Sequence, residues 1–207
     1  MIKIMSTSCI LSIFFIYNRI SAQENKLSDY IVTSVSDTLH GKVSHLNEKV
    51  FGPKFYKKIR FTNQMGKLKK IKRKNILAYK IDNDIFEGFW LKLSSQNGLF
   101  GNLTYIIDVE EGERHFLQVL QRDKLSHYRL LWWEEDRGSL LMSMDLFKKQ
   151  NENFFIRADQ GILGLKRKSL VKYFVDCIEL SEQLENKKIK KAHEVVDFYN
   201  TRCIQVK

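Results

Sequence analysis

The densest charge run of this chain places six cations within the eight residues 67–74. Leu68 and Ile71 interrupt the run, so a β-strand here would carry most of its cations on one face and its apolar residues on the other. Further cations lie on the preceding strand, which is expected to pair with it. The expected anion-binding residues are Lys58, Arg60, Lys67, Lys69, Lys70, Lys72, Arg73 and Lys74.

A basic plate of this kind suits anionic lipid, lipopolysaccharide or an acidic glycan, because each cation near an anionic surface contributes about 1 kcal/mol. The same lysines also suit an edge strand, where charge prevents two sheets from pairing edge to edge. The sequence therefore leaves two interpretations, a binding face and a solvated protective face.

Trp132 and Trp133, followed by Glu134, Glu135 and Asp136, place aromatic rings beside carboxylates, as many sugar-binding sites do. Neighbours on a strand point to opposite faces, so only one of the two rings can lie in the core. The other either stacks on a ligand or is covered by the C-terminal helices. Adjacent carboxylates at a strand end lack the separation across a cleft that glycoside hydrolysis needs.

The five histidines follow no metal-binding spacing, although two of them, on neighbouring expected strands, could face each other. They are His40, His45, His115, His127 and His193. The chain has no Gly-x-Ser-x-Gly elbow and no glycine-rich phosphate loop. We therefore expect no catalytic residue, metal or cofactor, and a non-catalytic binding or structural module. The alternative is an envelope hydrolase whose site the sequence does not reveal.

Short alternating runs between turn residues are typical of an antiparallel β-rich body, a barrel or sandwich-like meander, over residues 23–160. Ile59 and Phe61, for example, alternate with cations and lead to a turn that ends in Gly66. After Gly161 and Gly164 the period changes to that of helices. The expected fold class is α+β, with about three short helices over residues 161–207 packed on the β-rich body.

The first 22 residues read as an export signal. Lys3 supplies the positive start, residues 4–17 are a largely apolar run, and Ala22 is the small residue at the cut. No further segment is apolar enough over about 20 residues to span a membrane. The expected location is the periplasm or the periplasmic face of the outer membrane, where nucleic acid is a poor partner despite the net charge of +11. The oligomeric state stays open.

Cys177 and Cys203 remain after signal cleavage and would meet an oxidising compartment. An even number of cysteines there indicates a disulfide. The alternative is a pair of buried thiols that pack as small apolar residues.

Several segments resemble a family of uncharacterised exported proteins of flavobacteria and related Bacteroidota. The resembling segments are Ser21 to Gln23, Tyr30 to Thr33, Asp37 to Val43, Gly66 to Lys74, Tyr173 to Cys177, and Tyr199 with Asn200. The resemblance covers most of the chain after the signal. It implies export in a Gram-negative cell and assigns no activity.

The export signal yields a first prediction. Protein isolated from its native host should begin at Gln23, because the apolar run is too short and too diluted by serine and threonine for a membrane anchor. Mass spectrometry of the intact protein measures this. A protein that starts at Met1 and sediments with membranes would contradict the prediction.

Overall fold

The computed structural model describes residues 29–45, 58–95, 104–134 and 140–203. The expected signal segment, the side chains of Trp133 and Glu134, and residues Glu135 and Asp136 lie outside this description. Among the described residues, no helix is long and apolar enough to cross a membrane.

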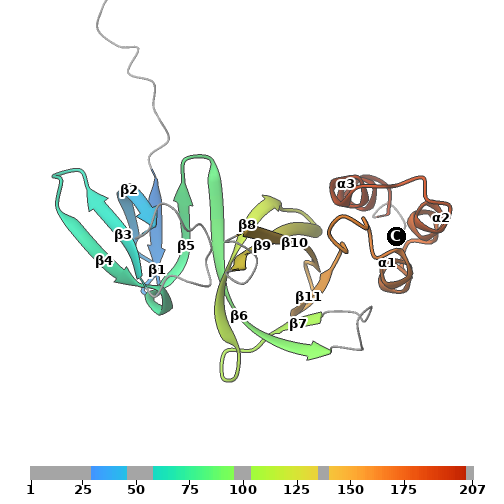
Figure 1. Cartoon of the computed structure of the whole chain (residues 1–207), viewed down its shortest axis with the longest axis horizontal. Coiled ribbons are helices and arrows are strands. Elements are labelled where there is room, and N and C mark those ends of the chain that lie inside the picture. Colours follow the sequence, from blue (N-terminus) through green and yellow to red (C-terminus); the bar gives the residue numbers. More distant parts are fainter. Residues whose placement is uncertain (1–28, 46–57, 96–103, 135–139, 204–207) are drawn as a thin grey trace, which may run out of the picture.

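The described strands form one antiparallel sheet of 11 strands in the order β4-β3-β2-β1-β5-β6-β7-β11-β10-β9-β8. Their bounds are β1 (Tyr30–Thr33), β2 (Thr38–His45), β3 (Lys58–Asn63), β4 (Leu68–Lys72), β5 (Ile76–Ile81), β6 (Asp84–Ser95), β7 (Thr104–Ile107), β8 (Glu113–Gln121), β9 (Leu125–Glu134), β10 (Leu140–Lys149) and β11 (Phe154–Arg157). Because β8 also pairs with β6, strands β6 to β11 close into a six-stranded barrel (Figure 1).

Along each barrel strand every second residue points inward, and these residues fill the barrel except at one end. On β9, Tyr128 and Leu130 point inward, whereas the next residue, Leu131, packs outside the barrel. Phe89, Tyr128 and Phe155 meet edge to face, with ring centroids 5.0–5.6 Å apart. This strict alternation is the pattern that the sequence predicts for half-buried strands.

Strands β1 to β5 form an N-terminal layer that packs on the outer wall of the barrel (Figure 1). Ile59 and Phe61 of β3 join a buried cluster with Phe116 and Leu131 of the wall. Gly66, at φ +76°, lies in the β3–β4 turn, a conformation that glycine adopts without strain. The expected hairpin over this segment is therefore confirmed.

Three C-terminal helices form a unit on the side of the barrel opposite to the N-terminal layer (Figure 1). They are α1 (Arg167–Tyr173), α2 (Ile178–Glu185) and α3 (Ala192–Arg202). The buried stripe of α3 consists of Ala192, Val195, Val196 and Tyr199. It packs in one cluster with Leu125 and Phe147 of the barrel wall, so the expected α+β class is confirmed.

Lys149 at the end of β10 ties the helical unit to the barrel. Its Nζ donates to Asp176 at 2.8 Å and lies 4.5 Å from the ring centroid of Tyr173. Tyr199 donates to the other oxygen of Asp176 at 2.7 Å. The amide of Asn200 pairs with both backbone groups of Leu125 at 2.9 Å. The segment between α1 and α2 and the last turns of α3 are therefore both held to the barrel by hydrogen bonds.

The strand order differs from a simple meander at two places. β5 pairs with β1 and not with β4, and β8 pairs with β6 and not with β7. The second pairing is possible because β6 has 12 residues, long enough to hold β5 and β7 in succession on one side. The closure of the barrel follows from this long strand, which the sequence does not distinguish from two short ones.

Cys177 and Cys203 are joined by a disulfide with a Cα–Cα distance of 5.4 Å. The bridge links the start of α2 to the end of α3 across 26 residues. Of the two alternatives that the sequence left open, the structure therefore shows the bridge.

The disulfide yields a second prediction. Replacing both cysteines by alanine should lower the free energy of unfolding by about 3–4 kcal/mol, because the unfolded chain regains the entropy of the open loop. Urea unfolding of the oxidised protein, the reduced protein and the double variant measures this. The reduced protein should unfold near the variant. Equal stability of the oxidised and reduced protein would contradict the prediction.

Candidate functional site

A basic groove of about 690 Å³ lies where the N-terminal layer meets the barrel wall. Five cations and one carboxylate line it together with an indole ring. These residues are Lys58, Lys72, Arg73, Lys74, Arg114, Glu113 and Trp90. The excess of positive charge makes the groove attractive to an anion.

The β3–β4 register places two of these cations side by side. Lys58 pairs with Lys72, and both side chains are exposed. The turn η2 (Arg73–Asn75) follows directly and adds Arg73 and Lys74. Four of the eight residues predicted from the sequence therefore line the groove.

The other four predicted residues lie elsewhere. By the register, Arg60 and Lys70 share the outer face with Lys58, whereas Lys69 pairs with Phe61 and lies on the opposite face. Lys67 precedes β4 in the turn. Lys58, Arg60, Lys70 and Lys72 therefore share one face of the hairpin, whereas Lys69 lies on the other face and Lys67 in the turn.

Arg114 of β8 was not predicted as a site residue, and it lines the groove from the barrel wall. Its guanidinium carbon is 5.4 Å from the ring centroid of Trp90, its partner on β6. It donates to the carbonyl of Ile76, while its Nε is buried without a hydrogen bond. A Cβ on Gly88 would lie 2.5 Å from the guanidinium. The absence of a side chain at Gly88 therefore makes room for Arg114.

Arg73 and Arg114 both stack near Phe116, at 5.8 and 5.7 Å from its ring centroid. Burial lowers the pKa of the Arg73 guanidinium, and the charge of Arg114 acts in the same direction. Burial also lowers the pKa of Arg114. Two half-buried cations that disfavour each other's charge are a favourable place for a bound anion.

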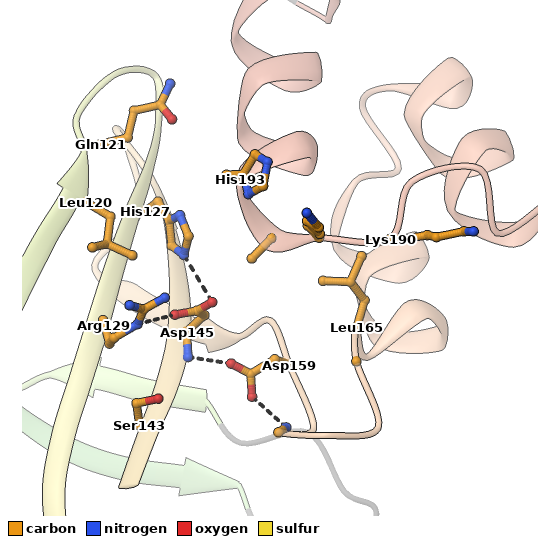
Figure 2. Close-up of a pocket in the computed structure, with 14 residues that line it drawn as sticks. Leu120, Gln121, His127, Arg129, Ser143, Asp145, Asp159, Leu165, Lys190 and His193 are labelled. Atoms are coloured by element: carbon orange, nitrogen blue, oxygen red, sulfur yellow. Dashed lines mark hydrogen bonds and ion pairs between the residues drawn. The ribbon is translucent and has the colours of Figure 1, made fainter. Parts of the chain in front are cut away.

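A second groove of about 520 Å³, the helix-side groove, lies between the barrel wall and the start of α3 (Figure 2). His127 and Arg129 line it from β9, Asp145 from β10, Asp159 from the segment after β11 and His193 from α3. Figure 2 shows Lys190 pointing away from these residues. The groove thus combines the residue types from which hydrolytic sites are built.

The carboxylates of the helix-side groove are occupied by internal contacts. Asp145 accepts from Arg129 Nε at 2.9 Å and lies 3.5 Å from His127 Nε2. Asp159 accepts from the backbone N–H of Asp145 at 2.6 Å and from that of Gly161 at 3.0 Å (Figure 2). His127 Nε2 forms no hydrogen bond to a nucleophile. These contacts join the turn to the barrel wall, which is a structural role.

His115 and His127 do not face each other. His115 lines the barrel interior, whereas His127 lies outside and packs against Phe147 at 5.4 Å between ring centroids. Within the described ranges, no group of three or more His, Cys, Asp or Glu residues could hold a metal ion. Trp132 packs in the barrel cluster, so one of the two neighbouring indoles is internal.

Sequence reasoning missed Trp90, Gly88 and Arg114 because they lie outside the charge run. A signal was present in the alternation of β6 and β8, which places Gly88, Trp90 and Arg114 on one outer face. This alternation brings the three residues together only if β8 pairs with β6. That pairing skips β7, the strand between them in the sequence, and cannot be read from the sequence.

The sequence matches no protein family model, and comparisons with curated proteins and with solved structures give no match.

The contacts of Asp145 yield a third prediction. Burial alone would raise its pKa, but the hydrogen bonds from His127 and Arg129 outweigh burial and lower the pKa. The carboxylate therefore stabilises the fold above about pH 4 and loses this contribution as the pH falls through the lowered pKa. Asp145→Asn should cost about 1–3 kcal/mol at pH 7, measured by urea unfolding, and the cost should shrink toward pH 3.

Asp37→Asn is the matched control, because Asp37 is exposed in the β1–β2 turn. Its free energy of unfolding should stay within about 0.5 kcal/mol of the wild type. A cost of Asp145→Asn that stays constant down to pH 3 would show that the carboxylate does not stabilise the fold through its charge.

Proposed function

We propose that this chain is an exported, non-catalytic binding module of the cell envelope whose basic groove binds anionic envelope components. The ligand chemistry is a phosphate or carboxylate group presented by an anionic lipid, a lipopolysaccharide or an acidic glycan. The proposed location, in the periplasm or on the periplasmic face of the outer membrane, follows from the export signal in the sequence.

The observation that carries this proposal is the convergence of Arg73 and Arg114 on Phe116 within a groove that also holds three lysines. Exposed lysines at an edge strand also have a protective role. A half-buried arginine in a wall position of the barrel does not protect an edge, because β8 is paired on both sides. The groove therefore supports binding more strongly than the charge run alone.

Guanidinium groups suit this role because their planar donors match the oxygens of phosphate and carboxylate. Arg114 Nε is buried without a hydrogen-bond acceptor, so the guanidinium keeps a donor that the fold leaves unsatisfied. Lys58 and Lys72 at the exposed rim add attraction at longer range, which salt screens beyond about 8 Å at physiological ionic strength.

Charge reversal within one hairpin yields the fourth prediction. Replacing the groove residues Lys58, Lys72 and Lys74 by glutamate should weaken binding to phosphatidylglycerol vesicles more than about 100-fold at low salt, given about 1 kcal/mol per cation. Vesicle sedimentation measures the binding, with phosphatidylcholine vesicles as the uncharged reference. Lipopolysaccharide and polygalacturonate, tested in parallel, distinguish the sources of the anion.

The matched control reverses Lys67, Lys69 and Lys70, which lie on the same hairpin but outside the groove. The two triple variants have the same net charge, so a groove-specific ligand should discriminate between them. Equal weakening by both variants would indicate attraction to the whole basic surface and contradict binding in the groove. If the wild-type protein binds none of the tested anionic ligands, the proposed function itself is contradicted.

A further inference from the structure

The barrel contains a hollow at one end of its interior. This barrel-mouth cavity has a volume of about 490 Å³, within the range of about 300–1,000 Å³ that is typical of small-molecule sites. Small barrels are normally filled by their own inward side chains. The described side chains leave this end open.

The deeper part of the barrel is closed by large side chains. Phe89, Tyr128 and Phe155 form the edge-to-face trio, and Leu117 and Leu146 are fully buried beside them. The cavity therefore has a packed apolar floor and opens in one direction.

The walls of the cavity are mostly apolar. Leu91, Leu93, Tyr105, Leu130, Trp132 and Met144 form most of the wall, and the buried imidazole of His115 adds a polar group. The hydroxyl of Tyr105 has the thioether of Met144 as its acceptor at 3.7 Å, so even this polar group is turned to an apolar partner. Charged side chains occur at the rim, where Lys92 pairs with Glu111. Such a lining suits a hydrocarbon chain better than a sugar or a nucleotide.

The barrel-mouth cavity and the basic groove lie on opposite faces of the same strand pair. Trp90 pairs with Arg114 and faces the groove, while the next pair, Leu91 with Glu113, lies beside the cavity. Glu113 lines both hollows. Gly112 of the adjoining turn approaches the backbone of Trp90 and Leu91 so closely that a Cβ would lie 2.7 Å from Trp90 C. The two hollows therefore adjoin at the end of this strand pair, where Glu113 lines both of them.

We propose that the two hollows together bind one single-chain anionic amphiphile, with its hydrocarbon chain in the barrel-mouth cavity and its anionic head in the basic groove. This inference rests on the proposed function and narrows its ligand to a lipid with a carboxylate or phosphate head. The volume of the cavity admits one chain. One of the two adjacent hollows is apolar and the other is cationic. An anionic amphiphile can fill both, whereas a plain hydrocarbon or a plain anion can fill only one.

Calorimetric titration of the full chain after signal cleavage with octanoate, decanoate and dodecanoate, below their micelle concentrations, tests this inference. Affinity should rise about fourfold per methylene until the chain fills the cavity. Dodecanol, which lacks the anionic head, should bind at least tenfold more weakly than dodecanoate. Inositol hexakisphosphate, which lacks a chain, reports the groove alone.

A filling variant locates the chain. Leu93→Trp places an indole at the cavity mouth and should abolish the dependence on chain length while leaving the binding of inositol hexakisphosphate intact. Leu77→Trp is the matched control, because Leu77 and Leu93 have similar exposure, 41% and 42%, but Leu77 lies on β5, outside the cavity. Its titrations should match those of the wild type.

Fluorescence quenching gives an independent location. 12-Bromododecanoate carries its heavy atom at the chain end and should quench Trp132 at the cavity wall. The quenching should persist in Trp90→Phe and disappear in Trp132→Phe. Quenching that disappears only in Trp90→Phe would place the chain in the groove and overturn the inference.

The outcomes separate the two proposals. Affinity that is independent of chain length, with inositol hexakisphosphate still bound, overturns the amphiphile and leaves the anion-binding groove standing. Dodecanol that binds as tightly as dodecanoate overturns joint occupancy, because the head then contributes nothing. If neither the fatty acids nor the polyphosphate bind, the proposed function fails together with the inference.

Discussion

Strand β6 holds β5 and β7 along one edge and β8 along the other, and the remaining architecture depends on this pairing. The pairing with β5 carries the N-terminal layer, and the pairing with β8 closes the barrel. Because successive residues point to opposite faces, Trp90 faces the basic groove and Leu91 the cavity. A slip of one residue would exchange the two, so the same register that buries Phe86 also fixes both hollows.

The position of the helical unit depends instead on polar contacts with one end of the barrel. Lys149 meets Asp176 and the aromatic rings around it, and Asn200 replaces a strand partner for the backbone of Leu125. Asp176 and Tyr199 belong to the segments on which the family resemblance rests. Their contacts here are with each other and with Lys149, so these residues help to hold the helical unit on the barrel.

The sequence was sufficient to predict the strands and helices but not the pairing that closes the barrel. Alternation and turn residues predicted the hairpins, and the stripe from Ala192 to Tyr199 predicted α3, because both signals are local. The β6–β8 pairing is set by tertiary packing around β7, and no local pattern encodes it. The site divides in the same way: Lys58, Lys72, Arg73 and Lys74 were found from a charge run, whereas Arg114 and Trp90 are brought to them only by the fold.

The basic groove concentrates features that a fold selected for stability alone would avoid. Gly88 weakens strand β6, since glycine has no side chain to pack and loses more entropy on folding. The room it leaves is taken by the Arg114 guanidinium, which lies near the like charge of Arg73 across one phenyl ring. Burial disfavours both charges, and their repulsion adds to that cost. Departures from local rules are expected at functional sites, where a ligand supplies the missing compensation. A bound anion between Arg73 and Arg114, as proposed, would offset their repulsion and so stabilise the folded protein. The helix-side groove offers no comparable gain, because the carboxylates of Asp145 and Asp159 already accept hydrogen bonds from within the protein.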